Sequence, residues 1–238
     1  MIEIDGSQGE GGGQVLRTAL ALSCVTGTPF RMEKIRARRR RPGLARQHLA
    51  AVRAAATVSG ARVDGAELGS THLWFAPGEA RAGDHHFAVE TAGSACLVFQ
   101  TVLWPLLAAE GRSRVVLEGG TQNPLAPPFD FIAETFLPAV RQMGARVEAR
   151  LERHGFYPAG GGRFVVEIEG GRGLRPVEWL EAGPIARQRA RVLLSELPRH
   201  IAERERKVLC RELGLRADGC RIEEVESSGQ STVWKTRQ

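Results

Sequence analysis

An internal repeat organises roughly the first 170 residues of the chain. The letters GARV occur at Gly60–Val63 and again at Gly144–Val147, 84 residues apart, each time where an expected helix gives way to an expected strand. The order of elements around both copies is the same: strand, helix, strand, helix, strand, strand. Repetition at this length is typical of stacked copies of one supersecondary unit. A four-letter match alone can arise by chance, so the interpretation depends on the shared element order.

Local patterns divide each copy of the repeat into helices and strands. Apolar periodicity and glycine or proline breaks predict, in the first copy, strands over 1–5, 29–35, 61–68 and 71–77 and helices over 14–25 and 44–59. In the second copy they predict strands over 85–90, 113–119, 145–152 and 163–169 and helices over 96–109 and 129–143. Gly60 and Gly144 suit the C-terminal caps of the second helix in each copy, and Pro105 is expected to bend its helix.

The pattern changes after Gly170. One or two strands are expected within 173–198, then a charged helix over 199–213, a candidate strand over 221–227 and a tail without regular structure. This region has too few elements to close a core by itself. We therefore predict an α/β (α+β) chain with a first βαβαββ module over 1–84, a second over 85–174, and part of a smaller α/β domain with an irregular tail over 175–238.

Charge favours a polyanionic partner. The net charge is +6 and the isoelectric point is near 9.7, a weak signal on its own because many arginine-rich proteins are basic. Here six arginines fall between Arg36 and Arg46. This concentration of charge gives the signal more weight.

Other features exclude several classes of protein. The four cysteines form no CxxC pair and are interpreted as core residues of a reducing compartment rather than disulfide or zinc ligands. The opening MIEIDGSQGEGGG lacks the basic start and apolar core of a signal peptide. No apolar run approaches the roughly 20 residues that span a bilayer. We therefore expect a cytoplasmic protein with no membrane partner, and the sequence does not predict its oligomeric state.

The glycine-rich segment GSQGEGGGQ lies between the first strand and the first helix. Such a turn exposes backbone N–H groups at a helix N-terminus, where anions bind favourably. It lacks the GK[ST] ending of a Walker loop, and the GxGxxG pattern fails at Gln14. Glu10 is unusual in a phosphate cradle and can hold a divalent metal or a hydroxyl group. The alternative is that the glycines only permit a tight turn.

The arginine loop gives a sharper hypothesis. In RRPGLARQH, Pro42 and Gly43 precede a helix, so the arginines approach the unpaired N–H groups of its first turn and form an anion site. Gln47 in that turn can join the same ligand, whereas His48 points elsewhere and is interpreted as structural. Because Arg38 and Arg40 alternate with Arg39, they are expected to face away. A solvated charge run remains the alternative for some of these arginines.

Two further loops are dense in glycine and proline. In LEGGTQNPLAPPFDF, Asn123 and Asp130 are interpreted as helix caps. In RHGFYPAGGGRF, three successive glycines indicate the close approach of a backbone or a ligand. His154 in this loop is either a nucleophile or base, or, as is more common for a lone histidine, a residue that orders the turn.

Five segments, in order along the chain, resemble the RNA 3'-terminal phosphate cyclases: IDGSQGEGGGQVLRTALALS, IRARRRRPGLARQHLAAV, GGTQNPLAPPFDFI, RHGFYPAGGG and PRHIAERE. The resemblance covers roughly Met1–Glu205. It implies stacked βαβαββ modules like those of the C-terminal domain of a translation initiation factor, with a smaller inserted domain. It also implies an enzyme that uses ATP and Mg²⁺ or Mn²⁺ to convert an RNA 3'-phosphate to a 2',3'-cyclic phosphate. An enzyme–AMP adduct on histidine and an RNA–adenylate precede attack by the 2'-hydroxyl group, with AMP leaving.

The resemblance also implies roles for individual residues. Arg36, Arg39 and Gln47 match the set that holds the RNA terminal phosphate, and Arg17 matches an active-site arginine. Two further positions match the nucleotide side of the site: Glu10, near ATP and the metal, and Gln100, a nucleotide contact.

One departure from the family affects activity. The adenylylated histidine of the family lies in a third module near the C-terminus, which the resemblance places beyond residue 238. We therefore expect a truncated cyclase that is inactive as given, whether by frameshift, by design or as a natural short form. The alternatives are a non-catalytic RNA-binding or ribosome-assembly relative and an enolpyruvyl transferase. The arginine and glutamine set argues against the first, and HGFYPAGGG argues against the second.

Overall fold

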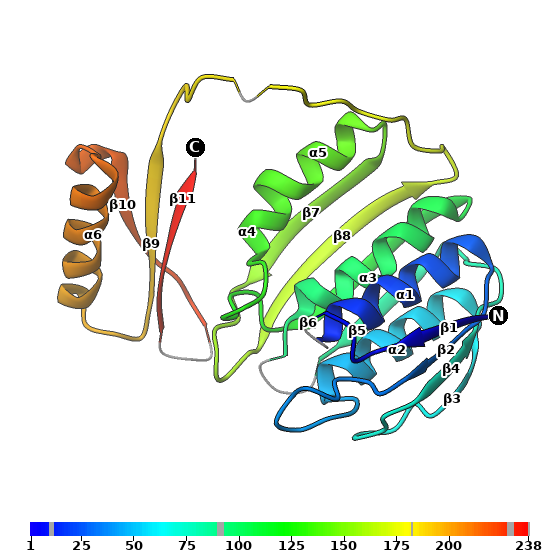
Figure 1. The fold of residues 1–238 in the computed structure, drawn as a ribbon. Coiled ribbons are helices and arrows are strands. Elements are labelled where there is room, and N and C mark those ends of the chain that lie inside the picture. Colours follow the sequence, from blue (N-terminus) through cyan, green and yellow to red (C-terminus); the bar gives the residue numbers. More distant parts are fainter. Residues whose placement is uncertain (10–11, 90–92, 182, 228–230, 238) are drawn as a thin grey trace.

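The structure is a computed structural model that describes residues 1–9, 12–89, 93–181, 183–227 and 231–237, the last of these ranges through its backbone. Its strands form three sheets, and helices cover one face of each (Figure 1). None of the helices in these ranges combines the length and apolar character of a membrane span.

The first sheet has the order β1-β2-β4-β3. Its strands are β1 (Ile2–Asp5), β2 (Phe30–Glu33), β3 (Arg62–Asp64) and β4 (Leu73–Ala76). β1 and β2 are parallel, and the other pairs are antiparallel. Two helices, α1 (Gly13–Thr26) and α2 (Arg46–Ser59), end at left-handed glycines, Gly27 and Gly60, as Gly60 was expected to do. Leu16, Leu20 and Cys24 recur every four residues on α1 and bury that face in the core.

The second sheet repeats this topology with the order β5-β6-β8-β7. Its strands are β5 (Asp84–Ala88), β6 (Gly111–Gly119), β7 (Arg146–Arg153) and β8 (Gly162–Gly170). Again the first pair is parallel and the others are antiparallel. The element order predicted from the repeat is therefore present in both halves.

The second helix of this half contains a wider turn. It runs through α4 (Phe129–Phe131), the π-helical η1 (Ile132–Phe136) and α5 (Leu137–Gln142). Leu137 donates its N–H to Ile132, five residues back. The next residue, Pro138, has no N–H for the ordinary bond four residues back, so the wider turn falls where the α-helical ladder is interrupted.

Helix α3 (Ala95–Ala108) joins the two halves. It is apolar around most of its circumference, as expected for a helix buried on several sides. It packs on β6 and β8 and also contacts α1 and α2, and the three helices lie side by side in Figure 1. Ala54 and Val58 of α2 belong to the same core as Phe99 of α3. This packing brings the starts of α1, α2 and α3 into one region.

The third sheet has the order β10-β9-β11 and follows an irregular segment over 171–188. Its elements are β9 (Arg189–Ser195), α6 (Arg199–Leu213), the 3-10 turn η2 (Ala217–Gly219), β10 (Cys220–Glu224) and β11 (Ser231–Arg237). β10 is parallel to β9 and β11 is antiparallel to it. The expectation of an irregular tail is wrong for β11. The run Thr232–Trp234 is β-branched and aromatic, and pairing with the edge of β9 satisfies its backbone.

Candidate functional site

The N-termini of three helices meet at one place. A Cβ atom added to Gly13, the first residue of α1, would lie 2.1 Å from Nε2 of His48 in the first turn of α2. Oε1 of Gln47 accepts a hydrogen bond of 3.3 Å from the backbone N–H of Ser94, which precedes α3. Helix N-termini carry unpaired N–H groups and the positive end of the helix dipole. Their convergence favours an anionic ligand.

His48 holds the start of α2. The side chain of Ala45 at the N-cap cannot accept a hydrogen bond, and Nδ1 of His48 instead accepts one of 3.2 Å from the N–H of Ala45. The proton of the neutral ring is therefore on Nε2, which faces Gly13. Burial, with smaller contributions from Arg36 and Arg17, lowers the pKa of His48 to about 3. His48 is structural, as expected, but it points toward the start of α1 and not away from the site.

Arg17 is a buried cation with unused donors. Its side chain is 7% exposed, and Nη2 donates a hydrogen bond of 3.0 Å to Oε1 of Gln14. Nε and Nη1 have no hydrogen-bond partner among the described residues. Burial lowers the pKa of Arg17 to about 10, which leaves it charged at neutral pH. Because a buried charge without partners is costly, this arrangement favours an anion beside α1.

The arginine loop covers the glycine-rich turn. Nη1 of Arg36 donates to the carbonyl of Gly43 at 2.7 Å, and burial followed by the charge of Arg39 lowers the pKa of Arg36. Nη2 of Arg39 lies 3.2 Å from the position that a Cβ atom of Gly12 would take. These two arginines therefore lie near each other, and Arg39 reaches the start of α1.

The expectation that Arg38 faces away is wrong. Its Nη1 donates a hydrogen bond of 3.0 Å to the carbonyl of Gly9 in the same glycine-rich turn. The alternation argument holds only for extended backbone, whereas residues 34–43 form successive turns and bends. Arg40 is exposed, as are Arg38 and Arg39.

The nucleotide side of the predicted site is less defined. Glu10 lies outside the described residues. Gln100 is half-buried in the second turn of α3, and no hydrogen bond to the other predicted residues is described for it. Within the described ranges no group of three or more His, Cys, Asp or Glu side chains is arranged to hold a metal ion. The four cysteines, all within these ranges, are free thiols.

Two glycines of HGFYPAGGG allow close backbone packing. A Cβ atom at Gly155 would lie 2.4 Å from the carbonyl oxygen of Gly119, and one at Gly162 would lie 2.6 Å from the nitrogen of Gly155. Of the three successive glycines, Gly162 therefore shows the expected close approach of another backbone. His154 is half-buried with a lowered pKa, mainly through burial, and its ring stacks on that of Phe156. These contacts fit a residue that orders the turn.

Sequence reasoning missed several contacts of the site. Gln14, Gly13 and Ser94 were not singled out, although they contact Arg17, His48 and Gln47. Glycine is unfavourable inside a helix. Its presence at position 13, where α1 begins, was therefore a sequence signal for a close contact at this position. Asp130, expected as a cap, instead accepts hydrogen bonds from Gln122 and from Arg191 of the third sheet.

A family profile and two similar proteins all indicate the same protein family. The family profile described as RNA 3'-terminal phosphate cyclase matches residues 8–233. The chain is 57% identical over 222 residues to the RNA 3'-terminal phosphate cyclase of Koribacter versatilis, covering 93% of this chain and 62% of that protein. It is 54% identical over 204 residues to that of Ectopseudomonas mendocina, covering 86% of this chain and 59% of that protein. The chain thus spans about three fifths of the length of these curated relatives.

A solved structure of EPSP synthase from Acinetobacter baumannii is also similar, at 13% identity and a TM-score of 0.31. The match covers 71% of this chain and 48% of the synthase.

Proposed function

The chain belongs to the RNA 3'-terminal phosphate cyclase family, and on this premise we propose that the three converging helix N-termini bind the 3'-phosphate end of an RNA. The protein would use ATP to convert that end to a 2',3'-cyclic phosphate, a ligase-type reaction that yields AMP and diphosphate. The observation that carries the proposal is the buried Arg17, whose Nε and Nη1 have no partner among the described residues. A terminal phosphate supplies the acceptor oxygens that this guanidinium lacks.

The other residues of the site have complementary roles in the proposal. Arg36 and Arg39 add charge around the phosphate, and the amide of Gln47 fixes its position next to the start of α3. Neutral His48 orders the first turn of α2 without adding charge. Held in this way, an adenylylated 3'-phosphate is open to attack by the neighbouring 2'-hydroxyl group, a step favoured by proximity.

ATP and a divalent metal ion, Mg²⁺ or Mn²⁺, are proposed on the side of Glu10 and Gln100. Glu10 is proposed as a protein ligand for the metal, because it lies at the acidic position of the glycine-rich turn within the region that matches the family. A hard cation bound through one carboxylate and substrate phosphates fits this donor set. When bound, the metal ion offsets charge on the phosphates.

The two halves with equal strand order are proposed as modules over 1–84 and 85–174, of the type found in the C-terminal domain of a translation initiation factor. Residues 175–238 are proposed as part of the inserted domain. The shared topology of the first two sheets supports this division.

We also propose that a polypeptide of residues 1–238 does not adenylylate itself. Its six histidines are His48, His72, His85, His86, His154 and His200. His48 is buried as a helix cap, and His86 pairs with Glu118. His154 is half-buried and has a lowered pKa. The names of the curated relatives support enzyme descent over a non-catalytic RNA-binding protein or an enolpyruvyl transferase.

End-group discrimination tests the proposed site. A labelled single-stranded RNA with a 3'-phosphate should bind at least about tenfold more tightly than its 3'-hydroxyl twin, because charge-assisted hydrogen bonds to a buried site contribute about 1.5–3 kcal/mol. Arg39→Ala should reduce this preference, whereas Arg204→Ala, an exposed arginine of α6, should keep it. Equal binding of both ends, weakened equally by salt, would mean nonspecific backbone attraction only.

A further inference from the structure

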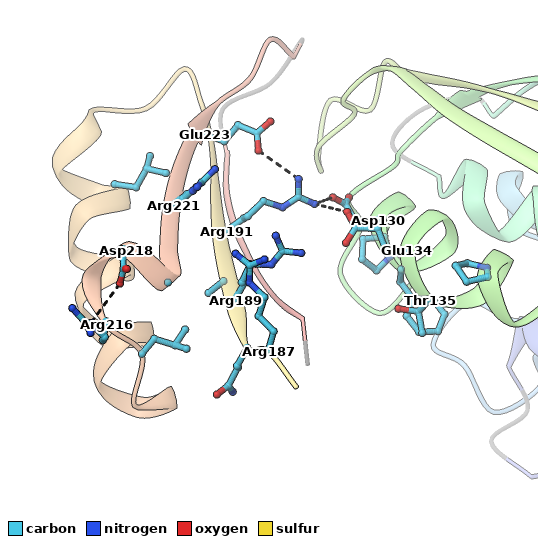
Figure 2. A pocket seen from close by; sticks show the side chains of 18 of the residues that line it. Asp130, Glu134, Thr135, Arg187, Arg189, Arg191, Arg216, Asp218, Arg221 and Glu223 are labelled. Carbon is cyan, nitrogen blue, oxygen red and sulfur yellow. Dashed lines mark hydrogen bonds and ion pairs between the residues drawn. The ribbon is translucent and has the colours of Figure 1, made fainter. Parts of the chain in front are cut away.

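A groove of about 1520 Å³ separates the second half of the molecule from the third sheet. One wall is the helix α4–η1–α5 and the other is the face of the third sheet opposite α6 (Figure 2). Arg191 spans it: Nη2 lies 2.6 Å from a carboxylate oxygen of Asp130 and 3.0 Å from one of Glu134, and Nη1 lies 3.5 Å from Glu223. These ion pairs link the two walls, and the single positive charge of Arg191 offsets part of the negative charge of the three carboxylates around it.

The sheet wall carries further arginines. Ala190 and Val192 pack with α6, so strand alternation puts Arg189 and Arg191 on the groove side. Arg221 is the neighbour of Arg191 on β10 and shares that face. Arg187, Arg189 and Arg221 line the groove, and no hydrogen bond or ion pair links their guanidinium groups to any residue whose side chain is described. The lining of the groove holds five arginines and four carboxylates, and the three guanidinium groups without a described partner lie together on one wall. This local excess of donors on one wall favours contact with the phosphate groups of a ligand.

The helix side of the groove presents aromatic rings. Trp179 is 63% exposed, and its Nε1 donates a hydrogen bond of 3.2 Å to Oε1 of Gln142 on α5. Phe131 of α4 is 46% exposed. Both residues line the groove. Exposed aromatic rings opposite a row of cations are typical of surfaces on which nucleic-acid bases stack while the backbone phosphates meet arginines.

We propose that this groove binds a segment of single-stranded RNA, with its phosphates on Arg187, Arg189 and Arg221 and its bases against Trp179 and Phe131. The aromatic rings favour RNA over an acidic peptide, because a peptide carboxylate gains nothing from a stacking surface. The choice of RNA rests on the proposed function of the family. The groove shares no residue with the terminal-phosphate site, so the two sites can be tested separately.

The experiment measures binding of a fluorescent single-stranded RNA with a 3'-hydroxyl end to the 238-residue chain over a range of salt concentrations. The variant Arg189→Ala/Arg221→Ala should raise Kd about tenfold and reduce the slope of log K against log salt by about 1.4, or about 0.7 for each lost phosphate contact. The matched control, Arg81→Ala/Arg204→Ala, removes two exposed arginines outside the groove and should change Kd less than about twofold.

A second variant separates RNA from other polyanions. Trp179→Ala should weaken RNA binding about fivefold or more, because stacking of one base on an aromatic ring is lost. Binding of a poly-glutamate peptide should be unaffected by this variant. The proposal is overturned if the groove and control variants lose affinity equally, or if Trp179→Ala leaves RNA binding unchanged. Preference for a 3'-phosphate should survive the groove variants, so failure of this proposal is distinguishable from failure of the terminal-phosphate site.

Discussion

Gly13→Ala probes the contact that joins the starts of α1 and α2. The added Cβ atom would lie 2.1 Å from Nε2 of His48 and 2.8 Å from Nη1 of Arg17. Ordinary contacts need about 3.5 Å, so the ring must move by more than about 1 Å. That movement strains or breaks its bond from the N–H of Ala45. Overpacking costs about 1–3 kcal/mol and a lost cap about 1 kcal/mol, while the better helix propensity of alanine returns up to about 1 kcal/mol.

The net destabilisation of about 2 kcal/mol should lower the melting temperature by roughly 4–8 °C, measured by differential scanning calorimetry. Gly183→Ala is the matched control, since a Cβ atom there would lie within 4 Å of no atom in the described part of the chain. In the double variant Gly13→Ala/His48→Ala the ring is absent, so the two destabilisations should fall short of additivity by about 1 kcal/mol or more. A melting temperature for Gly13→Ala equal to that of Gly183→Ala, or strict additivity, would refute the packing described here.

Three further predictions concern titration, the groove and activity. The pKa of His48 is about 3 in the folded protein, against an ordinary value of 6.5. Between these two pH values the unfolded chain binds a proton at His48 that the folded chain does not bind. The free energy of unfolding is therefore unaffected by this group above pH 6.5 and decreases as the pH falls toward 3. Urea unfolding at a series of pH values should show this loss, and the variant His48→Asn should show a weaker dependence of stability on pH. Arg191→Ala leaves Asp130 and Glu134 without their shared cation and should speed limited proteolysis of the segment 171–188 several-fold, with Arg204→Ala unchanged. Incubation of the 238-residue chain with labelled ATP and Mg²⁺ or Mn²⁺ should give no acid-labile protein–AMP adduct; a label abolished by His154→Ala would contradict this.

Local sequence patterns predicted most of the elements. Helix periodicity with flanking breaks placed the helix over 199–213 at the bounds found for α6. The GARV repeat predicted equal element order in both halves, and the strand orders agree. These features depend on neighbours a few residues apart, where periodicity and capping act. The π-helical turn was missed because Pro138 was not weighed as a missing donor within the expected helix.

The contacts that build the site could not be predicted from local sequence patterns. Gln47 meets Ser94 and His48 meets Gly13 only because α3 packs against α1 and α2. Likewise, Arg191 lies 61 residues from Asp130, and nothing local couples them. The arginine cluster was predicted as an anion site from composition and its place before a helix. The prediction that Arg38 faces away was wrong because it assumed the alternating side chains of an extended strand, whereas the backbone turns there.

The most direct test of the central claim follows the Nε–H group of Arg17 by NMR. In the structure this group is buried without a hydrogen-bond partner among the described residues. Titration with a short RNA ending in a 3'-phosphate should shift its ¹⁵N and ¹H resonances and slow its exchange with solvent, because the phosphate accepts its hydrogen bond. The same RNA with a 3'-hydroxyl end should leave these signals in place. An unchanged Arg17 signal when the phosphorylated RNA saturates the protein would contradict the assignment of this site.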